Sequence, residues 1–388
     1  MSTVIKYFHS GLTGAPVLSG TAGALRAVLD ACLVDGWGTA TADSVTITSG
    51  IATVTRSAGH PFEPQTVALI SGAAVSGSGT INGEQTVLST TATTYTFATA
   101  AVGTVSGTVQ HKFAPLGFTR ATPGTNTAAY QITGSGGTGF WLRLDDTGTT
   151  SARVVGYEAM SDVNTGTNAF PTAAQSSGGL FWGKSNSATT GVRAWSVLGD
   201  DRGFYMYTEG NFGSATGAMH GFGDFNSLKP ADAFNCFLAA WDADYSSSGF
   251  TTPMASNDIS CSYSAATGGT YVARPYTGTG SPRTVARQAQ APMMGLSLAQ
   301  SGAHGTSLYP NSSDVSLITA PVWIIETASP VTIRGSFPGL LHIVQSCSGV
   351  FTNRYILTGI TGLTGRSFRV LTPNGLPVLI DNTGPWRS

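Results

Sequence analysis

Charged side chains are scarce in this sequence, because its 388 residues include only 19 Lys or Arg and 20 Asp or Glu. Soluble proteins usually carry charge on about a quarter of their residues. Much of the surface must therefore be covered by neutral polar groups or by other subunits. The net charge of −1 provides no cationic cluster for a nucleic acid or an anionic membrane, so we expect no nucleic-acid partner.

Cysteine is equally scarce, with four residues at Cys32, Cys236, Cys261 and Cys347. They lie far apart and form no CxxC pair, so we expect buried free thiols. The six histidines show no HExxH or other zinc-ligand spacing. The sequence therefore predicts no metal site and no cofactor.

Long apolar runs and catalytic motifs are also missing. No window approaches the ~18 apolar residues of a membrane-spanning helix, and the N-terminus lacks the cationic and apolar segments of a signal peptide. The glycine-rich stretches lack the lysine of a phosphate-binding loop, and no GxSxG nucleophile elbow occurs. We expect neither a membrane span nor an enzyme.

The few acidic residues can be considered one by one. The Asp-Asp pairs at 145–146 and 200–201 precede turn residues, where Asp commonly caps the backbone. Glu158 with Asp145 or Asp162 stays open as a carboxylate pair for glycoside hydrolysis, because the separation in space decides that mechanism. The run HGFGDFN, from His220 onward, is expected to be a tight turn with packed Phe.

The first 43 residues predict an N-terminal arm and a helix. The segment SGTAGALRAVLDACLVDGWG carries apolar residues at helical spacing. Ser19 or Thr21 is expected to cap the first turn, and Gly36 to end the helix.

From Ser44 onward, β-branched residues alternate with other residues at a period of two, which is typical of strands. Strand-like segments recur about every ten residues, with turns at Ser49-Gly50 and Asn82-Gly83. Residues 44–113 are therefore predicted to form a small β-barrel or sandwich module.

The remainder predicts a mainly β fold in larger units. Residues 124–330 resume the strand pattern and contain many aromatics, which favours an antiparallel β-sandwich. Two low-charge stretches, 161–191 and 263–294, are expected to be long loops that could become ordered against a neighbour. The pattern of residues 331–388 predicts short strands, which form either a small closing module or an extension of the sheet.

Two groups of residues are candidates for contacts between subunits, on the helix and near the C-terminus. Packing within their own subunit is the alternative for both. Loop aromatics at Trp182, Tyr276 and Tyr309 could likewise anchor an interface or stack on a sugar. The candidate interface residues are Leu25, Val28, Leu29, Leu33, Pro385, Trp386 and Arg387.

The segment from Gly50 to Thr108 contains a GHPF turn, an NGEQTV hairpin and a TTYTF strand. It resembles a small β module that recurs in bacteriophage tail and other virion proteins. Beyond it, GAPVLSGTAGALRAVLDACLVDGWG, YEAMSDVNTG and LIDNTGPWRS are similar to segments of a family of phage virion structural proteins. This resemblance implies location in the virion, and it brings no catalytic or binding residues.

The function expected from these features is assembly. A tail-associated structural protein, in the baseplate, tail tip or fibre attachment, would bind other virion proteins and form a homo-oligomer. A host surface glycan is a further candidate partner. A capsid decoration or head-fibre protein is the first alternative. A spike that binds or degrades polysaccharide is the second.

Overall fold

The structure is a computed structural model. It describes residues 4–121, 124–209, 217–241, 269–288, 310–326, 330–343, 345, 351, 356–359, 365–372 and 378–387. The fold is mainly β, as the sequence predicts, with 48% strand and 4% helix. Cys261, Cys347 and Tyr309 lie outside the described residues.

The predicted helix is present as α1 (Ala24–Leu29), continued by the π-helical segment η1 (Asp30–Asp35). Gly36 follows with a φ of 66°, and a Cβ there would lie 2.2 Å from the carbonyl oxygen of Phe113. Glycine is therefore required at this stop. The predicted cap is wrong: Gly23 takes the N-cap position, and the N–H groups of Leu25 and Arg26 donate to the Asp146 carboxylate instead of to Ser19 or Thr21.

Residues 40–113 form a small module built from two four-stranded sheets. Ser49 and Gly50 both have positive φ, of 50° and 78°, and make the predicted hairpin turn. Phe97 and Phe113, one from each sheet, are buried in the core between them. The first sheet comprises β3 (Ser44–Thr48), β4 (Ile51–Thr55), β9 (Thr94–Ala98) and β8 (Ser89–Thr90). The second comprises β2 (Ala40–Thr41), β11 (Gln110–Phe113), β5 (Val67–Ser71) and β7 (Gly83–Thr86), with β6 (Ala74–Val75) and β10 (Val105–Ser106) as a separate pair.

A six-stranded antiparallel sheet follows. It comprises β12 (Thr119–Arg120), β13 (Thr127–Gln131), β14 (Trp141–Asp145), β15 (Ser151–Asp162), β16 (Thr165–Phe170) and β17 (Leu180–Gly183). The prediction of a loop over 161–191 is wrong for β16 and β17, which both pair with β15. The Thr, Gly and Asn residues of β16 hide its strand pattern, and β17 has only four residues, so pairing with β15 supplies what local propensity does not.

A thirteen-stranded antiparallel sheet forms the rest of the molecule. Its pairing crosses two boundaries expected from the sequence. Strand β1 (Lys6–His9), from the N-terminal arm, pairs with β18 (Ala194–Asp200), and β25 (Thr319–Glu326) pairs with β26 (Thr332–Ile343). Residues after 331 therefore extend this sheet. The prediction of a second loop over 263–294 is wrong for β23 and β24, which both lie within it and pair with each other. Along its main path the sheet comprises β1 (Lys6–His9), β18 (Ala194–Asp200), β19 (Gly203–Glu209), β20 (Ala218–Asp224), β22 (Cys236–Ala240), β23 (Gly269–Val272), β24 (Arg283–Gln288), β25 (Thr319–Glu326), β26 (Thr332–Ile343), β29 (Val378–Asp381), β28 (Ser367–Leu371) and β27 (Ile356–Thr358), and β21 (Asn226–Ser227) pairs with β26.

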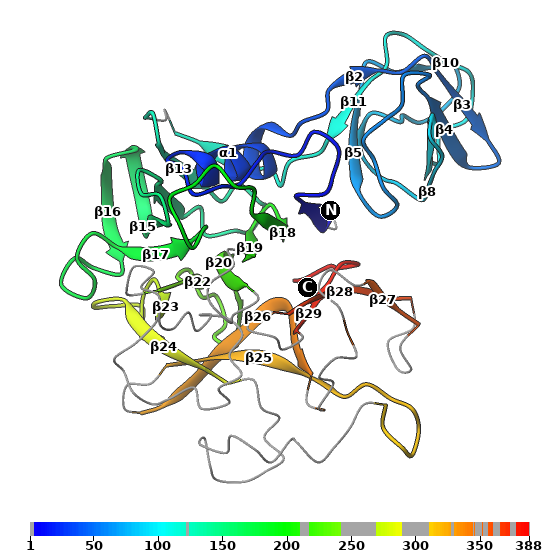
Figure 1. Cartoon of the computed structure of the whole chain (residues 1–388). Coiled ribbons are helices and arrows are strands. Elements are labelled where there is room, and N and C mark those ends of the chain that lie inside the picture. Colours follow the sequence, from blue (N-terminus) through cyan, green and yellow to red (C-terminus); the bar gives the residue numbers. More distant parts are fainter. Residues whose placement is uncertain are drawn as a thin grey trace.

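The large sheet is buried on both faces along β18, β19, β20 and β22 (Figure 1). One face shares a hydrophobic core with the six-stranded sheet, α1 and the small module. The other face packs against later strands of the same sheet, β25, β26, β28 and β29. There the rings of Phe237 and Phe337 meet edge to face, with their centroids 4.8 Å apart. Strands covered on both sides need few charged residues, which accounts for part of the unusual composition.

The run HGFGDFN is not a tight turn. His220 to Asp224 belong to β20, which is buried along its whole length. His220 lies flat against the indole of Trp182, with ring centroids 5.7 Å apart. Small residues on both sides of Phe222 allow the strand to lie between two layers.

Candidate functional site

The apolar helix face predicted as an interface is inside the subunit. Leu25, Val28, Leu29 and Leu33 each have 0% exposure and belong to the main core. A side chain with no accessible surface cannot contact another subunit in this conformation. Packing within the subunit, the alternative considered above, is what the structure has.

The C-terminal candidates also bind within their own chain. Trp386 is 5% exposed, its indole N–H donates to the Asp381 carbonyl at 2.8 Å, and its ring lies 5.3 Å from that of Tyr205. Arg387 donates to the Asp200 carboxylate and, at 2.6 Å, to the carbonyl of Asp224. Pro385 alone of the three candidates is exposed. This segment fastens the C-terminus to the large sheet.

The loop aromatics have different outcomes. Trp182 is not in a loop: it lies in β17, is fully buried, and donates to the Ala239 carbonyl at 3.0 Å. Tyr276 is 36% exposed, and its backbone N–H donates to Glu326. Of Trp182 and Tyr276, the two loop candidates that the structure describes, Tyr276 alone is accessible to solvent.

Neither of the two open glycosidase pairs forms, since Asp145 lies opposite Arg153, five residues from Glu158 along β15. Glu158 binds Arg274 through both oxygens, at 2.5 and 2.6 Å, and accepts from the Asn168 amide. Asp162 lies four residues further along the same strand, which corresponds to roughly 13 Å. That exceeds the ~5–9.5 Å between catalytic carboxyl groups of glycosidases.

Asp145 caps a turn, as expected. Its carboxylate accepts from the backbone N–H and the hydroxyl of Thr147. Because Asp145 sits at the start of that turn, its role is local. The same prediction is wrong for Asp146, whose carboxylate is fully buried, pairs with Lys184 and accepts from the N–H groups of Leu25 and Arg26.

Neither a metal centre nor a membrane-spanning helix is found in the described part of the chain. No three His, Cys, Asp or Glu side chains there are grouped as metal ligands. Over the same residues, no helix is long and apolar enough to cross a bilayer. Cys32 and Cys236 are buried free thiols, and burial raises the pKa of each well above its usual value.

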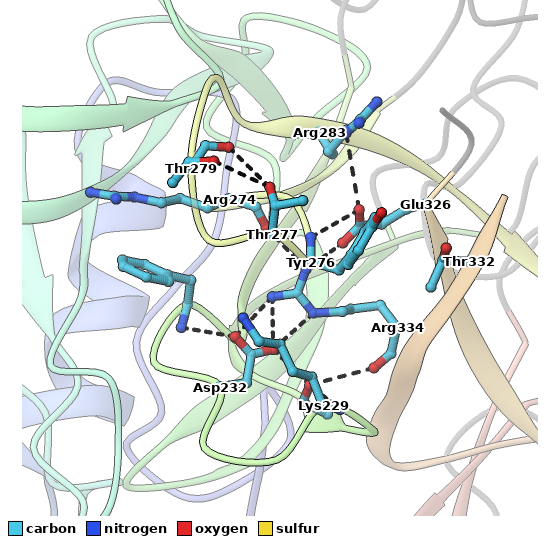
Figure 2. A network of polar contacts seen from close by, with 12 residues as sticks. Lys229, Asp232, Arg274, Tyr276, Thr277, Thr279, Arg283, Glu326, Thr332 and Arg334 are labelled. Atoms are coloured by element: carbon cyan, nitrogen blue, oxygen red, sulfur yellow. Dashed lines mark hydrogen bonds and ion pairs between the residues drawn. The ribbon is translucent and has the colours of Figure 1, made fainter. Parts of the chain in front are cut away.

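A buried ionic network surrounds Arg334 on β26 (Figure 2). The guanidinium is 1% exposed and binds Asp232 with two hydrogen bonds of 2.8 Å. It also donates to Glu326 on β25 and to the backbone carbonyl of Arg274. Glu326 in turn accepts from the backbone N–H of Tyr276 at 3.1 Å.

The network joins two loops to two strands. Arg334 pairs with both carboxylates, and Nε of Arg283 lies 4.0 Å from Oε2 of Glu326 as a second cation. Bidentate pairing of a planar guanidinium with a carboxylate is the strongest form of such a contact. Sequence reasoning missed these residues, because Arg334 and Asp232 are 102 positions apart and belong to no motif. The carboxylates are occupied by the guanidinium and by backbone donors, so the network acts as a structural fastening.

The outward face of the sheet β3-β4-β9-β8 is lined by hydroxyl groups. Register aligns Thr46 with Thr53 and Thr96 across three strands. A second row aligns Ser44 with Thr55 and Thr94 in the same way. We call the hydroxyl face the outward side chains Ser44, Thr46, Thr48, Thr53, Thr55, Ser89, Thr94 and Thr96.

These side chains are exposed or half-buried, while the alternate residues fill the core of the module. No residue of the four strands carries a charge. The repeated patterns TIT, TVT and TYT in the sequence would have revealed the face, but the pairing register is what aligns them.

The comparisons with known proteins leave the family open. No protein-family model matches the chain, and a search of curated proteins finds no match to it.

Proposed function

We propose that this chain is a structural protein of a bacteriophage virion, associated with the tail, and that it acts by binding other subunits through the hydroxyl face. The observation that carries the proposal is a sheet face, three strands wide, that presents Thr and Ser in register and no charge.

A neutral face of this kind is suited to assembly. Burying a charged group at an interface costs far more than burying a hydroxyl that can hydrogen-bond to a partner. Threonine is also stiff about χ1, so ordering it at an interface loses little side-chain entropy. Exposed sheets of monomeric proteins usually carry Lys or Glu that prevent such contact.

The placement of the charges supports the same function. Most basic side chains that the structure describes form ion pairs or hydrogen bonds within the chain, as Arg334, Arg274 and Arg387 do. The surface is consequently left with neutral polar groups. The resemblance of residues 50–108 to a module of phage tail proteins supports the tail as the location.

A charge placed at the centre of the hydroxyl face tests the proposal. Thr53→Glu should fold with unchanged circular dichroism and melting temperature, yet should be excluded from virions assembled in host cells. The matched control is Thr167→Glu, at an exposed threonine of β16, which should be incorporated like the wild type. Mass spectrometry of purified virions measures incorporation.

Incorporation of Thr53→Glu at the wild-type level would exclude the hydroxyl face as the contact surface. Virions that contain none of the wild-type chain would refute the virion assignment itself. Antibody labelling in electron microscopy then decides the location, since labelled capsids in place of tails would favour a decoration or head-fibre protein. Release of reducing sugar from host glycans by the pure chain would favour the polysaccharide spike.

A further inference from the structure

Lys184 and Asp146 form an ion pair that is completely enclosed. Both side chains have 0% exposure, and the Lys184 Nζ contacts Oδ1 of Asp146. Asp146 directly follows β14 and Lys184 directly follows β17, the strands on either side of the start of β15. A lysine is almost never fully buried unless it is paired, so this contact requires a specific explanation.

The backbone fixes both residues in place. The N–H of Asp146 donates to the Asn126 carbonyl at 2.9 Å, and the N–H of Lys184 donates to the Thr150 carbonyl at 2.9 Å. The ammonium group also donates to the Thr21 carbonyl at 2.7 Å. The amine and the carboxyl group are therefore held against each other with little freedom, which favours reaction between them.

The second carboxyl oxygen has its own donors. Oδ2 of Asp146 accepts from the backbone N–H of Leu25 at 2.7 Å and of Arg26 at 3.0 Å. Two backbone N–H groups that converge on one oxygen resemble an oxyanion hole, which stabilises negative charge on the oxygen of a tetrahedral intermediate. Oδ1, by contrast, faces the amine.

The protonation states also suit a reaction between the two groups. Burial raises the pKa of Asp146 and lowers the pKa of Lys184, and in both cases the attraction between the partners opposes the shift. Burial therefore favours transfer of one proton from Nζ to Oδ1, which gives a neutral amine and a neutral carboxylic acid.

We propose that Lys184 and Asp146 condense to an intramolecular isopeptide bond. After the proton transfer, the Nζ lone pair attacks Cγ, and the negative charge develops on Oδ2 between the Leu25 and Arg26 amides. The Cγ–Oδ1 bond then breaks. Oδ1 leaves as water with two protons that both come from the ammonium group, and the third proton remains on the amide nitrogen. The reaction needs no oxidant, reductant or second substrate.

The bond would tie the ends of β14 and β17 to each other beneath the start of α1. It would close a covalent ring between positions 38 residues apart, within the core shared by the six-stranded and large sheets. A crosslink of this kind survives unfolding, which is useful in a particle that must remain intact outside the cell. This proposal does not depend on the proposed function of the chain.

Intact mass under denaturing conditions tests the proposal on the full wild-type chain. The expected mass is that of the sequence less one water, and tandem spectra of a digest should contain a branched peptide that joins Asp146 to Lys184. Lys184→Arg should retain the full mass. Asp146→Asn should lose one ammonia instead of one water if it folds.

The matched control is Lys6→Arg. Lys6 also contacts an acidic side chain, but that of Glu84 is 36% exposed and remains solvated. Lys6→Arg should therefore show the same loss of one water as the wild type. A folded wild-type chain that keeps its full mass after prolonged incubation, with no branched peptide, would overturn the proposal whether or not the variants fold. A loss of water that tandem spectra place elsewhere would overturn it too.

Discussion

Acid should destabilise this fold through His220, and the effect can be isolated with one substitution. The ring has 0% exposure, and burial lowers its pKa from 6.5 to about 3, against a smaller opposing contribution from the Gly183 backbone. The folded chain therefore keeps His220 neutral down to about pH 3, whereas the unfolded chain protonates it below about pH 6.5. Stability must fall as the pH decreases between these two values.

The magnitude follows from proton linkage. A difference of one pKa unit between the folded and the unfolded chain corresponds to about 1.4 kcal/mol. At about pH 4.5 the solution is about two pH units below the pKa of His220 in the unfolded chain, whereas His220 in the folded chain is still neutral. His220 alone should then remove about 3 kcal/mol of the free energy of unfolding relative to neutral pH. That is a large share of the ~5–15 kcal/mol that stabilises a typical domain.

The assay compares urea denaturation of the wild type and His220→Phe at about pH 7.5 and about pH 4.5. Phenylalanine keeps a flat ring against Trp182 but cannot titrate, so the variant should lose about 3 kcal/mol less than the wild type. Trp182→Phe is the matched control, because it alters the same stack and leaves His220 to titrate. Equal losses in the wild type and His220→Phe would refute the reasoning.

Other substitutions test the remaining contacts. Arg334→Met should lower the free energy of unfolding by ~3–5 kcal/mol, because two carboxylates stay buried without their cation; a loss under ~1 kcal/mol in urea denaturation would be typical of a solvated pair and would contradict the burial. Gly339→Ala places a Cβ 2.2 Å from Nε1 of Trp386, so it should lower the melting temperature, and the double variant with Trp386→Ala should lose less than the sum of the two. Strict additivity would show that the two sites do not touch. Leu29→Ala should lower the free energy of unfolding by ~2–5 kcal/mol and leave the sedimentation coefficient unchanged. A changed sedimentation coefficient at unchanged stability would show that the helix face contacts another subunit.

Local patterns in the sequence were enough to predict the helix and the first hairpin. Apolar residues at helical spacing predicted α1 and η1, and Gly36 marked the end of η1, because a stop with positive φ depends on a single residue. Strict alternation and the Ser49-Gly50 turn predicted the β3-β4 hairpin for the same reason. Composition indicated a mainly β chain with few charges before any contact was known.

Contacts between distant segments could not be predicted in this way. The helix cap comes from Asp146, 121 residues after Leu25, and not from the nearby Ser19 or Thr21. Strands β16 and β17 lack an apolar alternation, and they form because β15 offers them a partner. Nothing in a local window distinguishes such a segment from a loop.

The sequence by itself determined that the chain is mainly β, poor in charge and interrupted by one helix, because these properties depend on composition and on spacings of a few residues. The tertiary structure decided which surface remains available. It buried the predicted helix face, Trp182 and Trp386, aligned the threonines of three strands into one face, and enclosed Lys184 with Asp146. Burial and register depend on which distant segments pack together, and that is settled only when the whole chain folds.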